Sequence, residues 1–275
     1  MNLIALYFRL LIRFLRFFAE AKTRYDLHSP YLFRLAEEVI EDRREFYTFP
    51  VVDKLRSKLL ADERIVQRLD FGAGSKIRPG KTDRTVRDIA HNSAVSPQSG
   101  KFLFRQVQFF HPKAMLELGT SLGISSAYQA GGAIHTPFYT IEGCPQTAAI
   151  ADANFRTLNL PHVHLLVGTF SDQLPIALQA LQKVDYIYLD GDHREGATLQ
   201  YLNTCLPYLA EEALIVVADI YWSDEMEKAW EQMRQHPKVR FSVDVFHFGL
   251  LFFRPTDDPP VHLKLVPARW KPWRF

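Results

Sequence analysis

The sequence lacks the features that mark disulfide-stabilised, membrane-spanning or secreted proteins. Its only cysteines, Cys144 and Cys205, form no redox or metal-binding motif, which indicates a reducing compartment or no redox role. No apolar run approaches the roughly 20 residues that a membrane span requires. No small-residue cleavage site follows a compact apolar run near the N-terminus. We therefore expect a cytoplasmic protein without a signal peptide.

Neither sign of charge predominates, because the net charge over 275 residues is only +2. This value gives no argument for an acidic partner, and no nucleic-acid partner is predicted. Apolar residues make up 47% and charged residues 23% of the chain, which is ordinary for a globular protein. The length suffices for one large α/β domain with an added segment, or for two small domains, and no internal repeat is visible.

The first strong pattern is an amphipathic helix over residues 2–20. Its apolar residues recur at spacings of three and four, whereas Arg9, Arg13 and Arg16 share another face. One interpretation is a helix on an anionic membrane surface, which would make the protein peripheral to the membrane. The other is a helix that packs on the core or at the interface of a homodimer. We favour packing because it is the commoner use of such a stripe.

Two more helices are expected in the N-terminal part. Ser29 and Pro30 provide a start signal for a helix over about residues 31–42, and another helix is expected over residues 51–68. The following stretch, residues 76–100, carries turn formers and basic side chains. It fits either a mobile basic lid over an anionic substrate or a solvated linker. The basic residues of this loop are Lys76, Arg78, Lys81, Arg84 and Arg87.

From residue 113 onward, strands and helices alternate. Five short apolar runs, each followed by a helical stretch, indicate βαβ units and a parallel sheet with helices on both faces. The expected parallel strands are residues 114–118, 137–142, 162–167, 184–190 and 213–219. Residues 239–245 and 250–254 are two further strands whose connection is too short for a helical crossover, so this pair must be antiparallel.

These patterns predict three segments. Residues 1–95 are an N-terminal helical extension with the basic loop, and residues 96–256 are the main α/β domain. Residues 257–275 are a C-terminal tail, which is expected to pack on the domain or at a dimer interface.

A glycine turn follows the first parallel strand. In Met115-Leu-Glu117-Leu-Gly119-Thr-Ser-Leu-Gly123, the strand ends near an acid, two glycines follow, and a helix begins near Ile124. Glycine allows positive φ and lets a ligand lie against the main chain, and the helix start offers free N–H groups. A similar acid–glycine segment at residues 69–75 lacks the apolar strand before it and the helix after it, so we interpret it as a loop.

Acidic residues end four of the five parallel strands. Ligands of open α/β sheets bind beyond the carboxyl ends of the strands, so these acids are expected at one rim. They are Glu117, Glu142, Asp190 and Asp219. Buried carboxylates are costly unless they bind something, and four of them on one rim indicate a site.

Glu142 narrows the class of ligand. It follows the glycine turn by about twenty residues, where an acid can accept hydrogen bonds from both ribose hydroxyls of a nucleoside. A dinucleotide site needs three glycines, but Ser121 and Ser126 stand at the second and third positions. A nucleoside without a pyrophosphate therefore fits better, with a nicotinamide-dependent oxidoreductase as the alternative.

The segments Glu117-Leu-Gly119-Thr-Ser-Leu-Gly123 and Tyr186-Ile-Tyr-Leu-Asp190-Gly-Asp-His193, with Glu142 and Ala218-Asp219, resemble class I S-adenosylmethionine-dependent methyltransferases. The resemblance is to the O-methyltransferase branch that includes the catechol-type enzymes, and it covers roughly residues 96–255. It implies a Rossmann-like seven-stranded, mostly parallel sheet with an antiparallel terminal hairpin. It also implies methyl transfer to an oxygen, or less often a nitrogen, of a small-molecule acceptor.

The resemblance assigns roles to individual residues. Glu117, Gly119 and Gly123 would line the methionine part of S-adenosylmethionine, and Glu142 would hold the ribose. Thr169 and Phe170 would lie beside the adenine, and Asp190 would face the methionine end or a metal. The full cofactor-binding set is Glu117, Gly119, Thr120, Ser121, Gly123, Glu142, Gly143, Gly168, Thr169, Phe170 and Asp190.

Catechol-type members hold Mg²⁺ with an acid after the fourth strand and a pair of polar residues after the fifth. Asp190 and Asp219 match two of these ligands, whereas Ile220 replaces the third, and Asp192 or His193 is considered as a substitute. Without the metal, His193 is the candidate general base and Asp190 the second catalytic residue, because histidine as a residue type titrates near neutral pH. The competing interpretation is that His193 caps the next helix. A non-catalytic, membrane-associated binding protein on the same fold is the remaining alternative.

Overall fold

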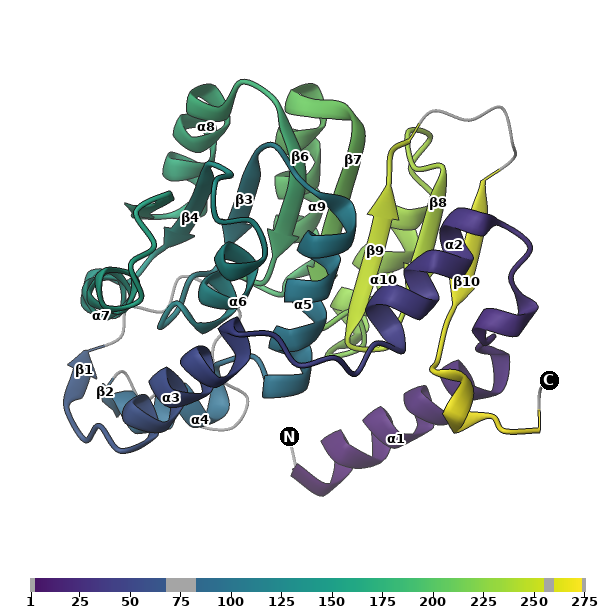
Figure 1. The fold of residues 1–275 in the computed structure, drawn as a ribbon, viewed down its shortest axis with the longest axis horizontal. Coiled ribbons are helices and arrows are strands. Elements are labelled where there is room, and N and C mark those ends of the chain that lie inside the picture. Colours follow the sequence, from purple (N-terminus) through teal and green to yellow (C-terminus); the bar gives the residue numbers. More distant parts are fainter. Residues whose placement is uncertain (1–2, 68–82, 255–259, 274–275) are drawn as a thin grey trace. The chain divides into compact units, whose positions relative to one another are not determined.

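A computed structural model of the chain describes residues 3–67, 83–254 and 260–273 (Figure 1). The described residues group into two compact units, which are treated separately below. The central unit consists of residues 44–187, and the terminal unit consists of residues 1–43 together with residues 188–275. This grouping divides the N-terminal helices between the two units. It does not test the separate extension expected over residues 1–95, which stays a prediction.

The predicted mostly parallel sheet is present, and it has one strand more than the seven expected. Its strands are β3 (Met115–Leu118), β4 (Phe138–Glu142), β5 (Val163–Val167), β6 (Val184–Leu189), β7 (Leu209–Ala218), β8 (Phe241–Asp244), β9 (Phe248–Phe252) and β10 (Val261–Lys264). In the central unit, to which most of β6 belongs, the order is β6-β3-β4-β5, and β4 pairs in parallel with both neighbours. In the terminal unit the order is β10-β8-β9-β7. Strand β9 is antiparallel to both β7 and β8, which confirms the predicted hairpin.

The additional strand, β10, comes from the tail. It pairs in parallel with β8, from Val261 opposite Phe241 to Lys264 opposite Asp244. Directly after it, Leu265 forms an isolated bridge with Lys22. The tail therefore completes the sheet of its own unit. The sequence showed only a short strand-like run here, because the partner of a parallel edge strand is not encoded locally.

The central unit carries most of the helices and one small extra hairpin. Its helices are α3 (Thr48–Leu60), α4 (Val86–Asn92), α5 (Pro97–Phe110), α6 (Ile124–Gly132), α7 (Pro145–Thr157) and α8 (Phe170–Leu181). Strands β1 (Ile65–Gln67) and β2 (Asp83–Thr85) pair in an antiparallel manner. An apolar cluster that includes Phe49, Val86, Phe104 and Tyr128 packs α3, α4, α5 and α6 together. This cluster fixes the helix that follows β3.

The helix expected over residues 51–68 was predicted too long. It ends at Leu60, and residues 65–67 pair with residues 83–85 instead. Backbone hydrogen bonds from Val86 N to Arg64 O (2.9 Å) and from Arg87 N to Asp62 O (2.8 Å) extend this pairing. Pairing with a strand about twenty residues further along the chain therefore outweighed the local helical pattern of residues 65–67.

The interpretation of the basic loop as a lid is wrong for two of its residues. Arg84 lies in β2 with only 6% of its surface exposed, and Arg87 of α4 forms an ion pair with Glu63. Both belong to packed secondary structure. Lys76, Arg78 and Lys81, and the second acid–glycine segment at residues 69–75, lie outside the described residues.

The terminal unit contains the predicted N-terminal helix. Its helices are α1 (Leu3–Glu20), α2 (Pro30–Leu35), α9 (Glu195–Cys205) and α10 (Asp224–Arg234), with single helical turns η1 (Arg24–Asp26), η2 (Ala36–Ile40), η3 (Leu206–Tyr208) and η4 (Ala268–Trp270). One face of α1 packs inside the unit, because the buried Phe17 ring lies 6.3 Å from Tyr221 and 5.4 Å from Phe246. Arg13 Nε of the same helix donates to Glu227 Oε2 at 2.8 Å. The favoured packing interpretation therefore holds for this face.

In the part of the chain that the structure describes, no helix combines the length and the apolar character needed to cross a membrane.

A buried carboxyl group lies at the end of β8. Asp244 is 3% exposed, and its two oxygens accept hydrogen bonds from Tyr221 OH (2.6 Å) and Phe246 N (2.8 Å). Burial raises the pKa of Asp244 from 3.8 to about 6, although both hydrogen bonds oppose the shift. The folded protein therefore binds this proton more tightly than the unfolded chain does, so ionisation of Asp244 destabilises the fold as pH rises from about 4 to about 6.

We expect Asp244→Asn to raise the free energy of unfolding by about 1 to 3 kcal/mol near pH 8, with little effect near pH 4. The amide cannot ionise, so it escapes the penalty that the buried carboxylate incurs. Urea unfolding at a series of pH values measures the difference. Asp152→Asn on the exposed surface of α7 is the control. Equal stabilities of Asp244→Asn and the wild type across this range would show that the fold does not raise the pKa of Asp244.

Candidate functional site

The glycine turn lies in the central unit between β3 and α6, as predicted. Three of its residues adopt left-handed backbone angles, with φ of 105° at Gly119, 50° at Ser121 and 80° at Gly123. The N–H groups of Gly119 and Thr120 both donate to Ile141 O at the end of β4, at 3.0 and 3.1 Å. The main chain is therefore fixed in a tight loop at the carboxyl ends of two neighbouring strands.

Gly123 also fixes how the helix after the turn packs. It is the N-terminal cap residue of α6, and a Cβ atom there would lie 2.7 Å from the Phe155 ring of α7. Only glycine allows both the positive φ and this close approach.

Glu117 is not placed to touch a ligand, so its predicted role as a lining residue needs revision. The residue is fully buried, and its carboxylate accepts hydrogen bonds from Ser125 Oγ (2.6 Å), Gln129 Nε2 (2.9 Å) and Thr140 Oγ1 (2.6 Å). Ser126 Oγ also donates to it. Three of these donors lie on α6, so Glu117 holds the start of this helix against β3. Ser126, taken from the sequence only as a missing glycine, is one of these donors.

Glu142 lies beside the turn at the end of β4. Its Oε2 accepts from the backbone N–H of Ser121 at 2.8 Å, and its Oε1 accepts from that of Cys144 at 2.9 Å. A carboxylate offers about four lone-pair positions, so these two bonds leave room for two further donors. The predicted ribose-binding acid is therefore oriented by the glycine turn and by the loop through Gly143, and it retains free acceptor positions.

The end of β5 supplies the third loop of this rim. Gly168 has a φ of 146°, and its N–H donates to Glu142 O at 3.0 Å. Thr169 caps α8, because its Oγ1 accepts from Asp172 N, and Phe170 is the first residue of the helix. The N-terminal N–H groups of α8 belong to the same rim of the central unit.

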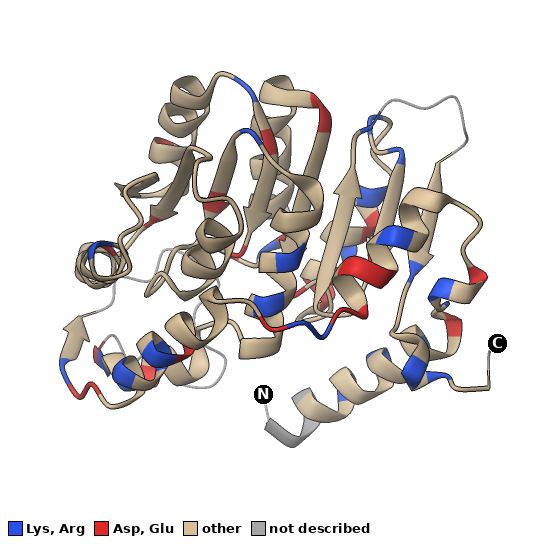
Figure 2. Ribbon diagram, in the orientation of Figure 1, with Lys and Arg blue, Asp and Glu red and all other residues tan. Residues whose placement is uncertain are grey.

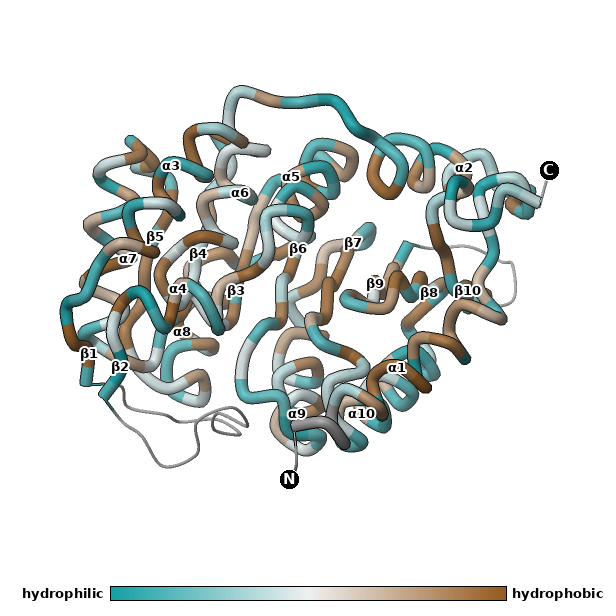
Figure 3. Tube along the Cα trace, turned by 90° about the horizontal axis from the view of Figure 1, so that it is seen from below, coloured by the Kyte–Doolittle hydropathy of each residue, from teal (hydrophilic) through white to brown (hydrophobic). Residues whose placement is uncertain are grey.

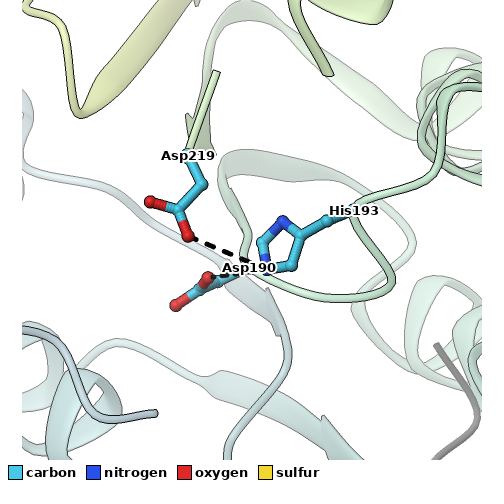
Figure 4. A group of neighbouring side chains, drawn as sticks. All are labelled: Asp190, His193 and Asp219. Carbon is cyan, nitrogen blue, oxygen red and sulfur yellow. Dashed lines mark ion pairs between the residues drawn. The ribbon is translucent and has the colours of Figure 1, made fainter. Parts of the chain in front are cut away.

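A second group of predicted site residues lies in the terminal unit, after β6 and β7. Figure 4 shows the imidazole of His193 facing the carboxylates of Asp190 and Asp219. The Nε2 atom lies 3.7 Å from Asp190 Oδ1 and 4.0 Å from Asp219 Oδ2. The side chains are 19% exposed at Asp190, 25% at His193 and 48% at Asp219, so the group is reachable from solvent.

The loops that carry this group have strained backbones. Asp192, His193 and Asp219 have positive φ values of 66°, 33° and 55°, which residues other than glycine rarely adopt. Such strain persists only where the surrounding structure enforces it, and it occurs often at functional sites. Asp192 shows how it is enforced, because its carboxylate accepts hydrogen bonds from Tyr201 OH (2.9 Å) and Arg194 NH2 (2.7 Å).

Burial and neighbouring groups shift the pKa of Asp190 in opposite directions. Burial raises the pKa of Asp190 to about 6, and the neighbouring Asp219 acts in the same direction. The charge of His193 and the hydrogen bond from Tyr188 OH at 2.8 Å oppose this shift. A proton on His193 would therefore stabilise the ionised form of Asp190, and the two groups act as a pair.

The donor set does not match the magnesium site that the resemblance implies. Mg²⁺ prefers a shell of oxygen ligands. Ile220, at the third ligand position, is fully buried and apolar, and Asp192 is already engaged by Arg194 and Tyr201. The ligand atoms of Asp190, His193 and Asp219 lie within 4.8 Å of one another, but one of the three is an imidazole nitrogen. These residues therefore do not form a magnesium site of the catechol type.

Comparisons with known proteins identify relatives in sequence and in fold. Residues 116–220 match a family model described as a methyltransferase domain. Proteins named catechol O-methyltransferase from Niastella koreensis and Mycobacterium tuberculosis are 31% and 30% identical over 129 residues. Each match covers 46% of this chain and 57% of the relative, so the chain spans just over half the length of these curated relatives.

Solved structures show the same fold. An O-methyltransferase from Streptomyces achromogenes in complex with S-adenosylmethionine has a TM-score of 0.55 at 17% identity, over 80% of this chain and 94% of its own. An O-methyltransferase from Bacillus cereus in complex with S-adenosylhomocysteine has a TM-score of 0.53 at 19% identity, over 77% of this chain and 92% of its own. The comparisons give no support to the nicotinamide-dependent alternative. Residues 116–220 are therefore similar in sequence to a methyltransferase domain, and the chain is similar in fold to O-methyltransferases solved with S-adenosylmethionine or S-adenosylhomocysteine.

Proposed function

We propose that the protein transfers the methyl group of S-adenosylmethionine to an oxygen of a small-molecule acceptor. The observation that carries the proposal is the fixed turn from Gly119 to Gly123, with Glu142 bound to its Ser121 N–H and still able to accept two further hydrogen bonds. A strand-end acid beside a glycine turn suits the ribose of a nucleoside cofactor. The domain match and the curated relatives support this choice of cofactor.

The residues of the central unit divide into contacting and positioning groups. Gly119 and Ser121 are only partly buried and are assigned to the methionine part of the cofactor, and Glu142 is assigned to the ribose hydroxyls. Thr120 is buried, and its hydroxyl pairs with that of Thr140, so it supports the turn from behind. Gly143, Gly168, Thr169 and Phe170 form the neighbouring loops, where the adenine is expected. Glu117 acts through α6 and does not contact the cofactor.

The chemistry requires alignment and removal of one proton. The acceptor oxygen attacks the methyl carbon in line with the sulfonium sulfur, the carbon–sulfur bond breaks, and S-adenosylhomocysteine leaves. We assign the acceptor's proton to Nε2 of His193. The resulting imidazolium gains two anionic partners, because Asp190 and Asp219 both have an oxygen within 4.0 Å of this nitrogen. No covalent enzyme intermediate is required.

Isothermal titration calorimetry with S-adenosylmethionine and S-adenosylhomocysteine tests the cofactor assignment. Binding of both, at micromolar dissociation constants, is expected. Catechol is the first acceptor to assay by mass spectrometry, because both curated relatives are named for it. Binding of neither adenosyl compound would refute the proposal, whereas cofactor binding without catechol methylation would refute only the choice of acceptor.

We expect the methyl-transfer rate to be independent of Mg²⁺. The donor set lacks the third oxygen ligand, since Ile220 occupies that position. After dialysis against EDTA, kcat should stay within about twofold of its value in Mg²⁺-containing buffer, because the proton is accepted by an imidazole. An activity that EDTA abolishes and Mg²⁺ alone restores would contradict this expectation and would reinstate Asp190 and Asp219 as metal ligands.

A further inference from the structure

Helix α1 exposes an unusual amount of apolar surface. Four of its large apolar side chains are more than half exposed, at 61% for Tyr7, 61% for Phe8, 52% for Leu11 and 56% for Leu15. Their spacings of three, four and seven residues place them on one side of the helix. Figure 3 shows α1 as a predominantly hydrophobic segment. A contiguous exposed patch of this kind marks an interaction surface.

This exposed stripe is not used to attach the helix to its own unit. A different face does so, through the buried Phe17 and through Arg13, whose side chain is only 10% exposed and pairs with Glu227 and Asp224. The stripe of Tyr7, Phe8, Leu11 and Leu15 points away from that face. Its exposure therefore has to be explained by something outside the unit.

The charges that α1 itself carries before its last residue have one sign. Arg9 is 60% exposed and lies 3.9 Å from Asp224 Oδ2 of α10, and Arg16 is exposed one helical turn beyond Arg13. No Asp or Glu occurs in α1 before its last residue, Glu20. The basic positions along this helix are blue in Figure 2. On α1 itself, an apolar stripe with arginines on the neighbouring face complements a surface that is apolar below and anionic above.

The C-terminal tail adds aromatic side chains beside the same helix. The Trp270 ring lies 6.4 Å from that of Phe14, and Lys271 Nζ lies 4.7 Å from the ring centre of Phe18. Trp270 and Trp273 are 46% and 69% exposed. Tryptophan favours the boundary between lipid headgroups and acyl chains. Two segments from opposite ends of the chain thus present the same kind of surface.

We propose that α1, with Trp270 at its side, binds the surface of an anionic lipid bilayer. The helix lies parallel to the membrane with Tyr7, Phe8, Leu11 and Leu15 below the headgroups. Arg9 and Arg16 contact the lipid phosphates. A helix with a strongly apolar face and an arginine-lined edge binds in this way, and anionic lipids strengthen the binding through each basic residue near the surface. This inference is independent of the proposed methyl transfer.

Vesicle co-sedimentation of the full chain tests the proposal. The probes are vesicles of phosphatidylcholine alone and of phosphatidylcholine with about 30% phosphatidylglycerol, an anionic lipid. We expect binding to the anionic vesicles that is at least about tenfold tighter than to the neutral ones, and that weakens with added salt. Leu11→Glu/Leu15→Glu should lose this binding. Ile134→Glu/Ile176→Glu, at positions 60% and 50% exposed in the central unit, is the matched control and should bind as the wild type does.

Two outcomes would overturn the proposal. Equal sedimentation of the two double variants would show that the stripe is not the lipid contact. A wild-type dimer in sedimentation velocity that Leu11→Glu/Leu15→Glu converts to a monomer, without any vesicle binding, would show that a second copy covers the stripe. Circular dichroism confirms that the variants are folded. Arg9→Gln/Arg16→Gln, which removes the charge of both side chains, should weaken binding to anionic vesicles. Its weak binding to neutral vesicles should not change.

Discussion

Replacing His193 by glutamine is expected to lower kcat for methyl transfer by about 10²- to 10⁴-fold, the usual contribution of a general base. Glutamine keeps a polar group of similar reach but cannot accept the acceptor's proton at neutral pH. The loss should be in kcat, because no cofactor contact is assigned to His193. Steady-state kinetics by mass spectrometry, with S-adenosylmethionine binding measured in parallel by calorimetry, separates the two effects.

The control for this variant is His91→Gln. His91 is an exposed histidine near the end of α4 and has no part in the proposed site. Its kcat should equal that of the wild type. A kcat of His193→Gln within about threefold of the wild type would show that another group or water takes the proton, and would favour the interpretation of His193 as a structural residue.

The second large effect is expected at the glycine turn. Gly119→Val should weaken S-adenosylmethionine binding by at least about a hundredfold, because a β-branched residue disfavours the φ of 105° by roughly 1 to 3 kcal/mol and adds side-chain volume where the main chain meets the ligand. Relaxation of the turn would also withdraw the Ser121 N–H from Glu142. Isothermal titration calorimetry measures the change directly.

A glycine outside the turn provides the comparison. Gly196 lies in the first turn of α9, where an added Cβ meets no atom within 4 Å, so Gly196→Ala should bind the cofactor normally. Thermal unfolding identifies any loss of fold in Gly119→Val. If that variant melts above the assay temperature and still binds with wild-type affinity, the cofactor does not lie against this turn.

The alternating part of the chain was predictable because its signals are local. Each strand from β3 to β7 is a short apolar run followed by a helix, and residues 246–249 leave no room for anything except an antiparallel turn. Helix starts are also local signals. Ser29 and Pro30 mark the start of α2, as predicted, and Ser96 and Pro97 form the equivalent start of α5.

The elements that were missed depend on distant partners. Residues 65–67 became a strand only by pairing with residues 83–85, and β10 is defined by its parallel pairing with β8. Neither partner can be identified from the short segment itself. The conformations of residues 65–67 and of β10 therefore depend on pairing with distant strands more than on local propensity.

The same division applies to the site. Glu142 and the glycines were identifiable because a strand end, an acid and a positive-φ turn each have a sequence pattern. The role of Glu117 was misjudged because it depends on hydroxyl and amide donors of α6, and the sequence does not show that these face inward. His193 was selected by residue type, whereas its distances to Asp190 and Asp219 depend on how the loops after β6 and β7 are folded.

The discontinuous composition of the terminal unit sets the order in which the protein is completed on the ribosome. The central unit is one continuous stretch and can fold as soon as it has emerged, since domains generally fold as units during synthesis. Helix α1 is made before the central unit. The side chains that pack against its Phe17 are Tyr221 and Phe246, which are made more than 200 residues later. At about 5 to 20 residues per second, α1 waits for ten seconds or more with all of its apolar faces uncovered. In this interval the nascent chain is exposed to chaperones and to lipid, long before its sheet is closed by β10.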